Sequence, residues 1–133
     1  MQREVADRLA APPGSKTYGA LSVGVQAVAS VERLFIVKAG AFRPPPKVDS
    51  AVVRLVPRVS PAVQEAERRG FRVFTGALFS QRRKQLARSL RDAAGLDKAG
   101  AERLLATAGI DATARPEVLA PEQLVTLFRA ATR

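Results

Sequence analysis

The sequence contains no cysteine and no histidine, and each absence excludes a class of site. Without cysteine there can be no disulfide framework and no thiolate metal site. Without histidine, a zinc site of the usual kind, an imidazole base and a serine–histidine triad are excluded as well. No apolar run approaches the ~20 residues that span a bilayer, and the first residues form no hydrophobic signal region. We therefore expect a cytosolic protein without a metal or a membrane partner.

The charge of the chain is strongly unbalanced. Lysine and arginine total 22 against 12 acidic residues, which gives a net charge of +10 and a pI near 11.4. Such a field attracts polyanions, and nucleic acid is the commonest partner of a basic soluble protein. A membrane surface is the alternative polyanion, but no basic amphipathic helix with a bulky aromatic face stands out. With 133 residues, 47% of them apolar, the chain can bury the core of one domain, or of one small domain plus a fragment of another.

A run of three prolines, residues 44–46, is the most distinctive local feature. Proline fixes φ and lacks an amide donor, so this run predicts a stiff, extended loop rather than a helix or a central strand. Phe42 precedes the run, and Arg43 and Lys47 flank it. An aromatic ring beside these cations suits a platform for stacking a nucleobase. The alternative is a simple connector whose Phe42 folds back onto a sheet, and the local residues alone slightly favour this second interpretation.

Hydrophobic patterns predict two strands followed by a helical region. Runs of β-branched residues predict strands at Val31–Lys38 and Ser50–Pro57. Apolar stripes bounded by proline, glycine or capping residues predict the helices. These are Gln2–Ala11, Tyr18–Ala29, Val63–Leu78 (as one helix or two, broken near Gly70), a helix from Ser80 or Gln81 to Ala94, Lys98–Ala108 and Pro121–Ala131.

The β signal stops at residues 58–61, so a domain boundary is expected there. Residues 1–58 would form one unit and residues 59–133 a second, helical one. The densest cationic cluster lies in the second unit, within the predicted helix that ends at Ala94. Its members are Arg82, Arg83, Lys84, Arg88 and Arg91.

Three of these cations would share one helical face, because Lys84, Arg88 and Arg91 recur at i, i+4 and i+7. Cations this close repel one another, and an anion relieves the repulsion; arginine forks match phosphate oxygens. Nucleic-acid contact is therefore expected, of the kind that positions a protein without reading base sequence. The alternative is a solvated face that is basic for solubility.

Five segments of the chain resemble the motifs of one family, the bacterial small-subunit ribosomal RNA adenine dimethyltransferases, whose loss confers kasugamycin resistance. Each segment is weak alone, but their order and spacing together are specific. The segments are Met1–Leu9 (Q-[KR]-E-V-A-x-R-L), Ser15–Gly19 (S-K-x-Y-G), Phe42–Ser50 (F-x-P-P-P-K-V-D-S), Phe79–Lys84 (F-x-Q-R-R-K) and Gly109–Asp111 with Arg115 and Glu117 (G-I-D…R-x-E). Two positions depart from the pattern: Ala20 stands where the family usually has arginine, and Pro116 replaces a common alanine.

The resemblance implies an α+β fragment. It would hold the last helices and the β-hairpin of a Rossmann-like methyltransferase sheet, followed by a small all-α C-terminal domain. Intact members transfer methyl groups from S-adenosylmethionine to adjacent adenines of small-subunit ribosomal RNA. Phe42 would pack on the target base, and Arg43, Lys47 and the cations of residues 82–91 would contact ribosomal RNA.

Parts of the family pattern are missing from this chain. No two of its nine glycines are spaced two apart, as a methyl-donor loop requires, and the absence of asparagine removes the N-[LI]-P-Y motif that grips the target amine. We therefore expect no catalytic residue within the chain. S-adenosylmethionine would bind the intact enzyme but not this chain alone.

Two further hypotheses stay open. The chain could be a monomeric RNA-binding or ribosome-associated module of the 30S particle that catalyses nothing. It could instead be a truncated gene product that folds poorly, because an isolated two-stranded sheet is marginally stable.

Overall fold

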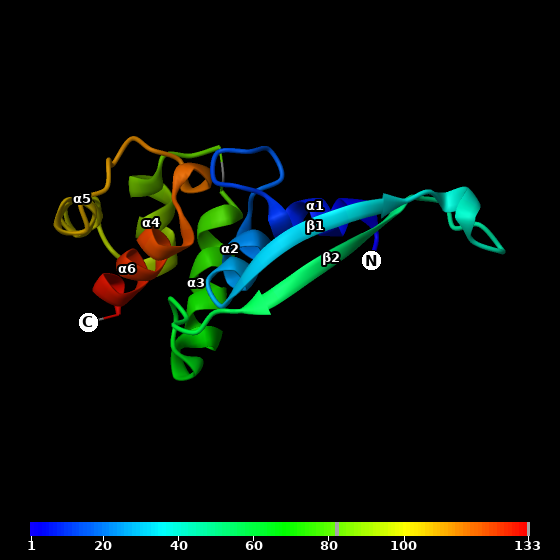
Figure 1. Ribbon diagram of the computed structural model, residues 1–133. Coiled ribbons are helices and arrows are strands. Elements are labelled where there is room, and N and C mark those ends of the chain that lie inside the picture. The colour runs from blue at the N-terminus through cyan, green and yellow to red at the C-terminus, as the bar shows by residue number, and fades with distance from the viewer. Residues whose placement is uncertain (82, 133) are drawn as a thin grey trace.

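The computed structural model describes residues 1–81 and 83–132 (Figure 1). This part of the chain holds six α-helices and one two-stranded antiparallel sheet, which confirms the expected α+β class. The helices are α1 (Arg3–Ala10), α2 (Ala20–Gln26), α3 (Arg68–Phe79), α4 (Leu86–Ala94), α5 (Lys98–Thr107) and α6 (Pro121–Ala131). The strands are β1 (Ala29–Val37) and β2 (Ser50–Pro57), each within two residues of its predicted bounds.

The two strands form a long hairpin that projects from the lobe of helices, with the connecting loop at its far end (Figure 1). The register runs from Ala29 opposite Pro57 to Val37 opposite Ser50, with an irregularity between Arg33 and Phe35. β-branched residues favour this pleated geometry on both strands. The hairpin therefore holds its loop well away from the helical core.

The first residues of the chain lie along the second edge of β2. A bridge joins Gln2 to Ser50, the Arg3 amide donates to the Asp49 carbonyl (3.0 Å), and the Ala51 amide donates to the Met1 carbonyl (2.8 Å). Only the start of β2 gains a neighbour in this way. Within the described residues, no strand pairs with the rest of that edge.

One hydrophobic cluster joins α2 to the helical lobe. Val23 of α2 and Ala27, the residue after this helix, are fully buried in the same cluster as Phe71 of α3 and Phe128 of α6. Just before α2, the buried hydroxyl of Tyr18 donates to the Leu119 carbonyl at 2.6 Å. Burial, with a smaller effect of the Glu122 charge, raises the pKa of Tyr18. This cluster draws residues from both sides of position 58, where the domain boundary stays a prediction.

Helix α3 begins later than the apolar pattern predicts. Residues 63 and 64 are not helical, and a 3₁₀ turn, Glu65–Glu67, precedes the first α-helical residue, Arg68. Of the two predicted alternatives, one helix or two, the structure has one: α3 runs through Gly70 without interruption. A Cβ at Gly70 would lie 3.1 Å from Cζ of the Phe128 ring, so glycine allows α3 to approach α6 closely.

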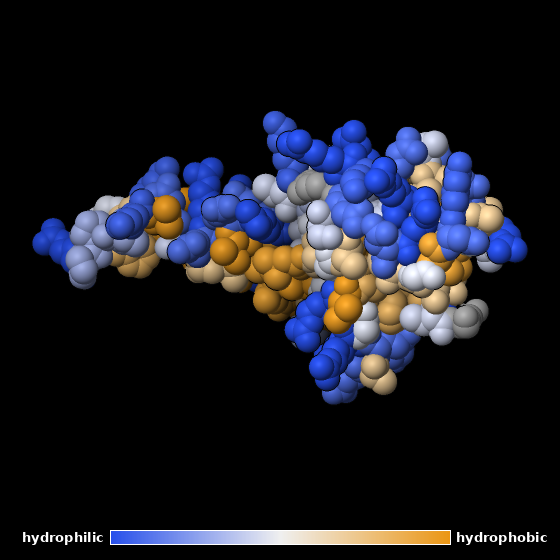
Figure 2. Space-filling view, turned by 180° about the vertical axis from the view of Figure 1, so that it is seen from behind, coloured by the Kyte–Doolittle hydropathy of each residue, from blue (hydrophilic) through white to orange (hydrophobic). Residues whose placement is uncertain are grey.

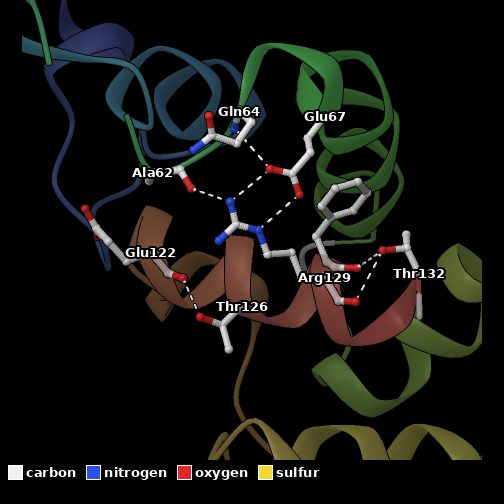
Figure 3. A network of polar contacts seen from close by, with 8 residues as sticks. Ala62, Gln64, Glu67, Glu122, Thr126, Arg129 and Thr132 are labelled. Atoms are coloured by element: carbon white, nitrogen blue, oxygen red, sulfur yellow. Dashed lines mark hydrogen bonds and ion pairs between the residues drawn. The ribbon is translucent and has the colours of Figure 1, made fainter. Parts of the chain in front are cut away.

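The 3₁₀ turn is held to α6 by a two-pronged ion pair (Figure 3). The Arg129 guanidinium donates to both carboxylate oxygens of Glu67, at 3.0 and 2.9 Å, and to the Ala62 carbonyl at 3.2 Å. Glu67 also accepts the Gln64 amide at 3.0 Å. Hydrogen bonds from Arg129, and then from the Gln64 amide, lower the pKa of Glu67 from 4.5 to about 2.

This ion pair predicts a stability loss at low pH. Because the folded pKa of Glu67 lies below its ordinary value, its contribution is complete above about pH 4.5 and disappears as the pH falls toward 2. The free energy of unfolding, measured with urea over this range, should fall more steeply for the wild type than for Glu67→Gln. Glu102→Gln, an exposed substitution on α5, is the control and should follow the wild type. Parallel curves for the wild type and Glu67→Gln would contradict the assigned pKa.

Candidate nucleic-acid interface

The loop at the far end of the hairpin presents the predicted aromatic residue to solvent. A 3₁₀ turn, Ala39–Ala41, leads into Phe42, a residue that is 42% exposed. Arg43 and Lys47 are exposed on the same loop. The structure thus brings these three residues together on one projecting segment, far from the core (Figure 1).

Asp49 closes the base of this loop. Its carboxylate accepts the Ala39 amide at 3.0 Å and the Lys38 ammonium at 3.4 Å, and Arg3 lies 3.8 Å away. The hydrogen bond from the Ala39 amide, followed by the hydrogen bond and charge of Lys38, lowers the pKa of Asp49. No local pattern predicts this role for Asp49, although it stands within the P-P-P-K-V-D-S segment.

The prediction of a basic helix from Ser80 or Gln81 to Ala94 is wrong for the residues before Leu86 that the structure describes. Helix α4 begins at Leu86, because Gln85 is extended (φ −62°, ψ 148°) and the Leu86 amide donates to the Ala114 carbonyl at 2.6 Å. Arg83 and Lys84 therefore lie in the turn before α4, and Lys84 does not share a helical face with Arg88 and Arg91. Arg82 lies outside the described residues.

Arg88 and Arg91 do lie together on α4, where they line an open hollow of about 490 Å³ with Lys98 of α5. Two carboxylates, Asp92 and Glu102, line it too. Asp92 accepts a hydrogen bond from the Gln81 side chain at 2.9 Å. The hollow is therefore of mixed charge. Helix α4 ends at Ala94, as predicted, and the next residue, Gly95, is in the left-handed conformation (φ +65°).

A second hollow, of about 500 Å³, is lined by cations from three separate segments. These are Lys16, Arg83 and Arg115. Arg83 was predicted as an RNA contact, whereas Lys16 and Arg115 were noted only as members of family motifs. No local pattern connects the three positions, because tertiary contacts assemble this hollow.

Hydrophilic and apolar side chains gather on different parts of the surface. Figure 2 shows hydrophilic side chains over the upper part of the lobe and an apolar patch near the junction of hairpin and lobe. Large apolar side chains are exposed along the hairpin: Leu34, Phe35, Val52, Leu55 and Val56. A two-stranded sheet with apolar residues exposed on it is typical of a surface that another element covers.

Neither a metal centre nor a membrane segment is found in the part of the chain that the structure describes. No three acidic side chains there are placed to hold a metal ion. No helix there has the length and apolar character needed to cross a membrane.

The role of Asp49 can be tested by amide hydrogen exchange. In Asp49→Ala the Ala39 amide loses its acceptor, so its exchange should accelerate together with that of the neighbouring loop amides. Asp97→Ala is the matched control, because Asp97 accepts the Gly100 amide at 2.7 Å at the start of α5. This control should accelerate exchange near Gly100 and leave Ala39 unchanged. Unaltered Ala39 exchange in Asp49→Ala would show that the carboxylate does not order the loop.

Comparison with known proteins gives a consistent result across the chain. A family model described as ribosomal RNA adenine dimethylase matches residues 1–133. The ribosomal RNA small subunit methyltransferase A of Xanthomonas euvesicatoria is 60% identical over 90 residues, which are 68% of this chain and 34% of that protein. The protein of the same name from Xanthomonas axonopodis is 59% identical over the same coverage. The matched segment thus spans about a third of these relatives.

Two solved structures resemble the fold. A dimethyladenosine transferase from Plasmodium falciparum superposes with a TM-score of 0.74 at 21% identity, over 95% of this chain and 53% of that one. The 23S rRNA methyltransferase ErmE superposes with a TM-score of 0.65 at 26% identity, over 99% of this chain and 52% of that one. The chain spans about half of each neighbour.

Proposed function

Since the chain belongs to the ribosomal RNA adenine dimethylase family, we propose that it is the C-terminal, RNA-docking portion of a methyltransferase that modifies adjacent adenines of small-subunit ribosomal RNA. The observation that carries this proposal is the family match over residues 1–133, together with a chain that covers only a third to a half of its relatives. In this proposal S-adenosylmethionine binds polypeptide other than these 133 residues. No catalytic residue and no cofactor contact is assigned within them.

The hairpin supports a place in a larger sheet. Met1 and Gln2 pair with the start of β2, while no described strand pairs with the remainder of that edge. Unpaired strand edges and exposed apolar side chains favour further pairing. In the proposal, β1 and β2 are the last strands of a Rossmann-like sheet, and the remaining strands carry the methyl-donor loop.

The chemistry explains the role proposed for Phe42. The exocyclic amine of adenine is a poor nucleophile because its lone pair is delocalised into the ring, so the enzyme must unstack the base and align the amine with the sulfonium methyl. A ring at the tip of a projecting, anchored loop can pack on such an extruded base. Arg43 and Lys47, which follow Phe42 on the same loop, would hold the neighbouring phosphates.

The cations of the lobe are proposed to dock the RNA. Arg83, Lys84, Arg88 and Arg91 are all exposed. Across residues 1–81 and 83–132, none of the four forms a salt bridge. Unpaired guanidinium groups remain available to phosphate oxygens. Such contacts position the lobe and leave base selection to the loop.

A non-catalytic RNA-binding module is the second candidate. The continuous cluster that joins α2 to α3 and α6, together with the Tyr18–Leu119 hydrogen bond, favours a chain that folds as a monomer without further polypeptide. This candidate shares the RNA contacts but not the methyl transfer. The two candidates therefore differ in one assay, methylation by a completed enzyme.

The assay needs a chimera in which residues 1–133 follow the N-terminal portion of a Xanthomonas relative. Phe42→Ala in this chimera should lower methyl transfer more than RNA affinity, because loss of a base stack removes about 1–3 kcal/mol at the reacting base. Phe42→Tyr, which keeps the ring, should retain most of the transfer. The 133-residue chain alone is the blank and should transfer no methyl group. A chimera that binds RNA but never methylates it would favour the non-catalytic candidate.

RNA docking by α4 is tested by the salt dependence of RNA affinity. Arg88→Gln with Arg91→Gln should flatten the slope of log K against log salt by up to about 0.7–0.9 for each phosphate that the protein no longer binds. Arg69→Gln with Arg103→Gln removes the same charge from exposed positions on α3 and α5 and is the control. Equal changes in the two double variants would mean that net charge alone decides RNA affinity. They would support the alternative that α4 has a solvated basic face for solubility.

A further inference from the structure

An open apolar groove of about 630 Å³ lies between α2 and α3, two helices that contact each other near the base of the hairpin (Figure 1). Its apolar lining consists of Leu21, Val25, Val28, Val63 and Phe71. Phe71 and Val63 are buried, Val25 and Val28 are half-buried, and Leu21 is 48% exposed. The groove thus has a closed floor and an apolar wall that solvent reaches.

Two glycines also line this groove, Gly24 within α2 and Gly76 within α3. Glycine is less favourable than alanine inside a helix, so its presence there needs a reason. A Cβ at either position would meet no atom within 4 Å, so packing within the described chain does not require glycine at either site. Glycine on a surface of this kind allows the main chain of another element to come close.

The rim of the groove is positively charged. Arg68 and Arg72 of α3 line it and are exposed, and neither forms a salt bridge with a residue in the part of the chain that the structure describes. No carboxylate is found among the described residues that line the groove. The two cations stand at i and i+4, where they repel each other, so an acidic group from outside would stabilise both.

We propose that this groove binds an acidic amphipathic helix of a partner protein. Apolar side chains on one face of that helix would pack on the α2 wall, and its carboxylates would pair with Arg68 and Arg72. From Arg68 to Gly76, α3 rises by about 12 Å, which matches two turns of a partner helix with anchors at i, i+4 and i+7. A polynucleotide would pair with the two arginines but would leave the apolar wall uncovered, so the groove favours protein over RNA.

The first test measures the affinity of the 133-residue chain for three labelled helical peptides of about 14 residues, about 21 Å of helix. The peptides share one leucine face and carry glutamate, glutamine or lysine beside it. At low ionic strength, where exposed ion pairs are least screened, the glutamate peptide should bind about tenfold more tightly than the lysine peptide. Equal affinities for the three peptides, or no binding of the glutamate peptide, would overturn the proposal.

A second test fills the groove. Gly76→Leu should weaken binding of the glutamate peptide at least about tenfold, because its side chain would occupy the space of one apolar anchor. Val73→Leu is the matched control, since Val73 is 67% exposed on the same helix and does not line the groove. The double variant Gly24→Ala, Gly76→Ala adds two methyl groups and favours the helical state of both segments, so it should weaken binding without loss of thermal stability. Unchanged affinity in both groove variants would show that the peptide binds elsewhere.

A third test concerns the rim. The variant Arg68→Gln, Arg72→Gln should reduce the preference for the glutamate peptide over the lysine peptide about fivefold. The control variant Arg69→Gln, Arg103→Gln removes the same charge from other exposed positions and should keep most of that preference. An equal reduction in the two variants would mean that net charge alone attracts the peptide, and the docking site would be overturned.

Two further outcomes separate this inference from the proposed function. The chimera with the N-terminal portion of a Xanthomonas relative should also bind the glutamate peptide; a chimera that does not bind it would show that other parts of the polypeptide cover the groove, and would overturn the proposal. Gly76→Leu should leave the affinity for a structured RNA oligonucleotide unchanged, and a loss of RNA binding would assign the groove to RNA instead. Peptide binding by a chain that binds no RNA would support the groove and overturn the proposed function.

Discussion

The packing of α2 into the helical lobe determines the position of every candidate contact. β1 starts three residues after α2 ends, so the direction of the hairpin depends on how α2 is seated between α3 and α6. Val23 and Ala27 are fully buried in this packing. Just before α2, the Tyr18 hydroxyl donates a hydrogen bond to the Leu119 carbonyl and so fixes the start of the helix. A buried carbonyl without this donor would destabilise the fold by about 1–3 kcal/mol. The loop with Phe42 and the cationic lobe thus share one rigid support.

The positive charges of the lobe are distributed over separate segments rather than along one helix. Dispersal reduces the repulsion that a helix carrying five neighbouring cations would suffer. It also places cations where backbone hydrogen bonds, such as Leu86 to Ala114, hold the main chain in position. Surface ion pairs elsewhere, such as Arg58 with Glu122 and Arg129 with Glu67, occupy other arginines in structural roles. Net charge alone therefore does not reveal which cations are available to RNA.

Local sequence was sufficient for some features of the fold. The strands follow from dense β-branched residues, and the end of α4 follows from Gly95, which adopts a left-handed conformation. The start of α4 was missed because a hydrogen bond to a residue 28 positions away, Ala114, decides it. Lys16 and Arg115 were missed as members of one site for the same reason. Both positions lie within family motifs, but only the tertiary structure shows that they lie together.

The length of the hairpin has a consequence for how a substrate would be selected. The aromatic tip and the cationic lobe lie at opposite ends of a stiff arm, with Asp49 and the long register of β1 and β2 resisting any change of reach (Figure 1). An arm of this kind sets a fixed distance between two contact surfaces. Under the proposed function, a folded RNA would bind when its phosphates and extruded base are separated by this distance, and would not bind when its helices are bent or spaced differently. Discrimination between correctly and incorrectly assembled particles would then be a measurement of distance, with no base sequence involved.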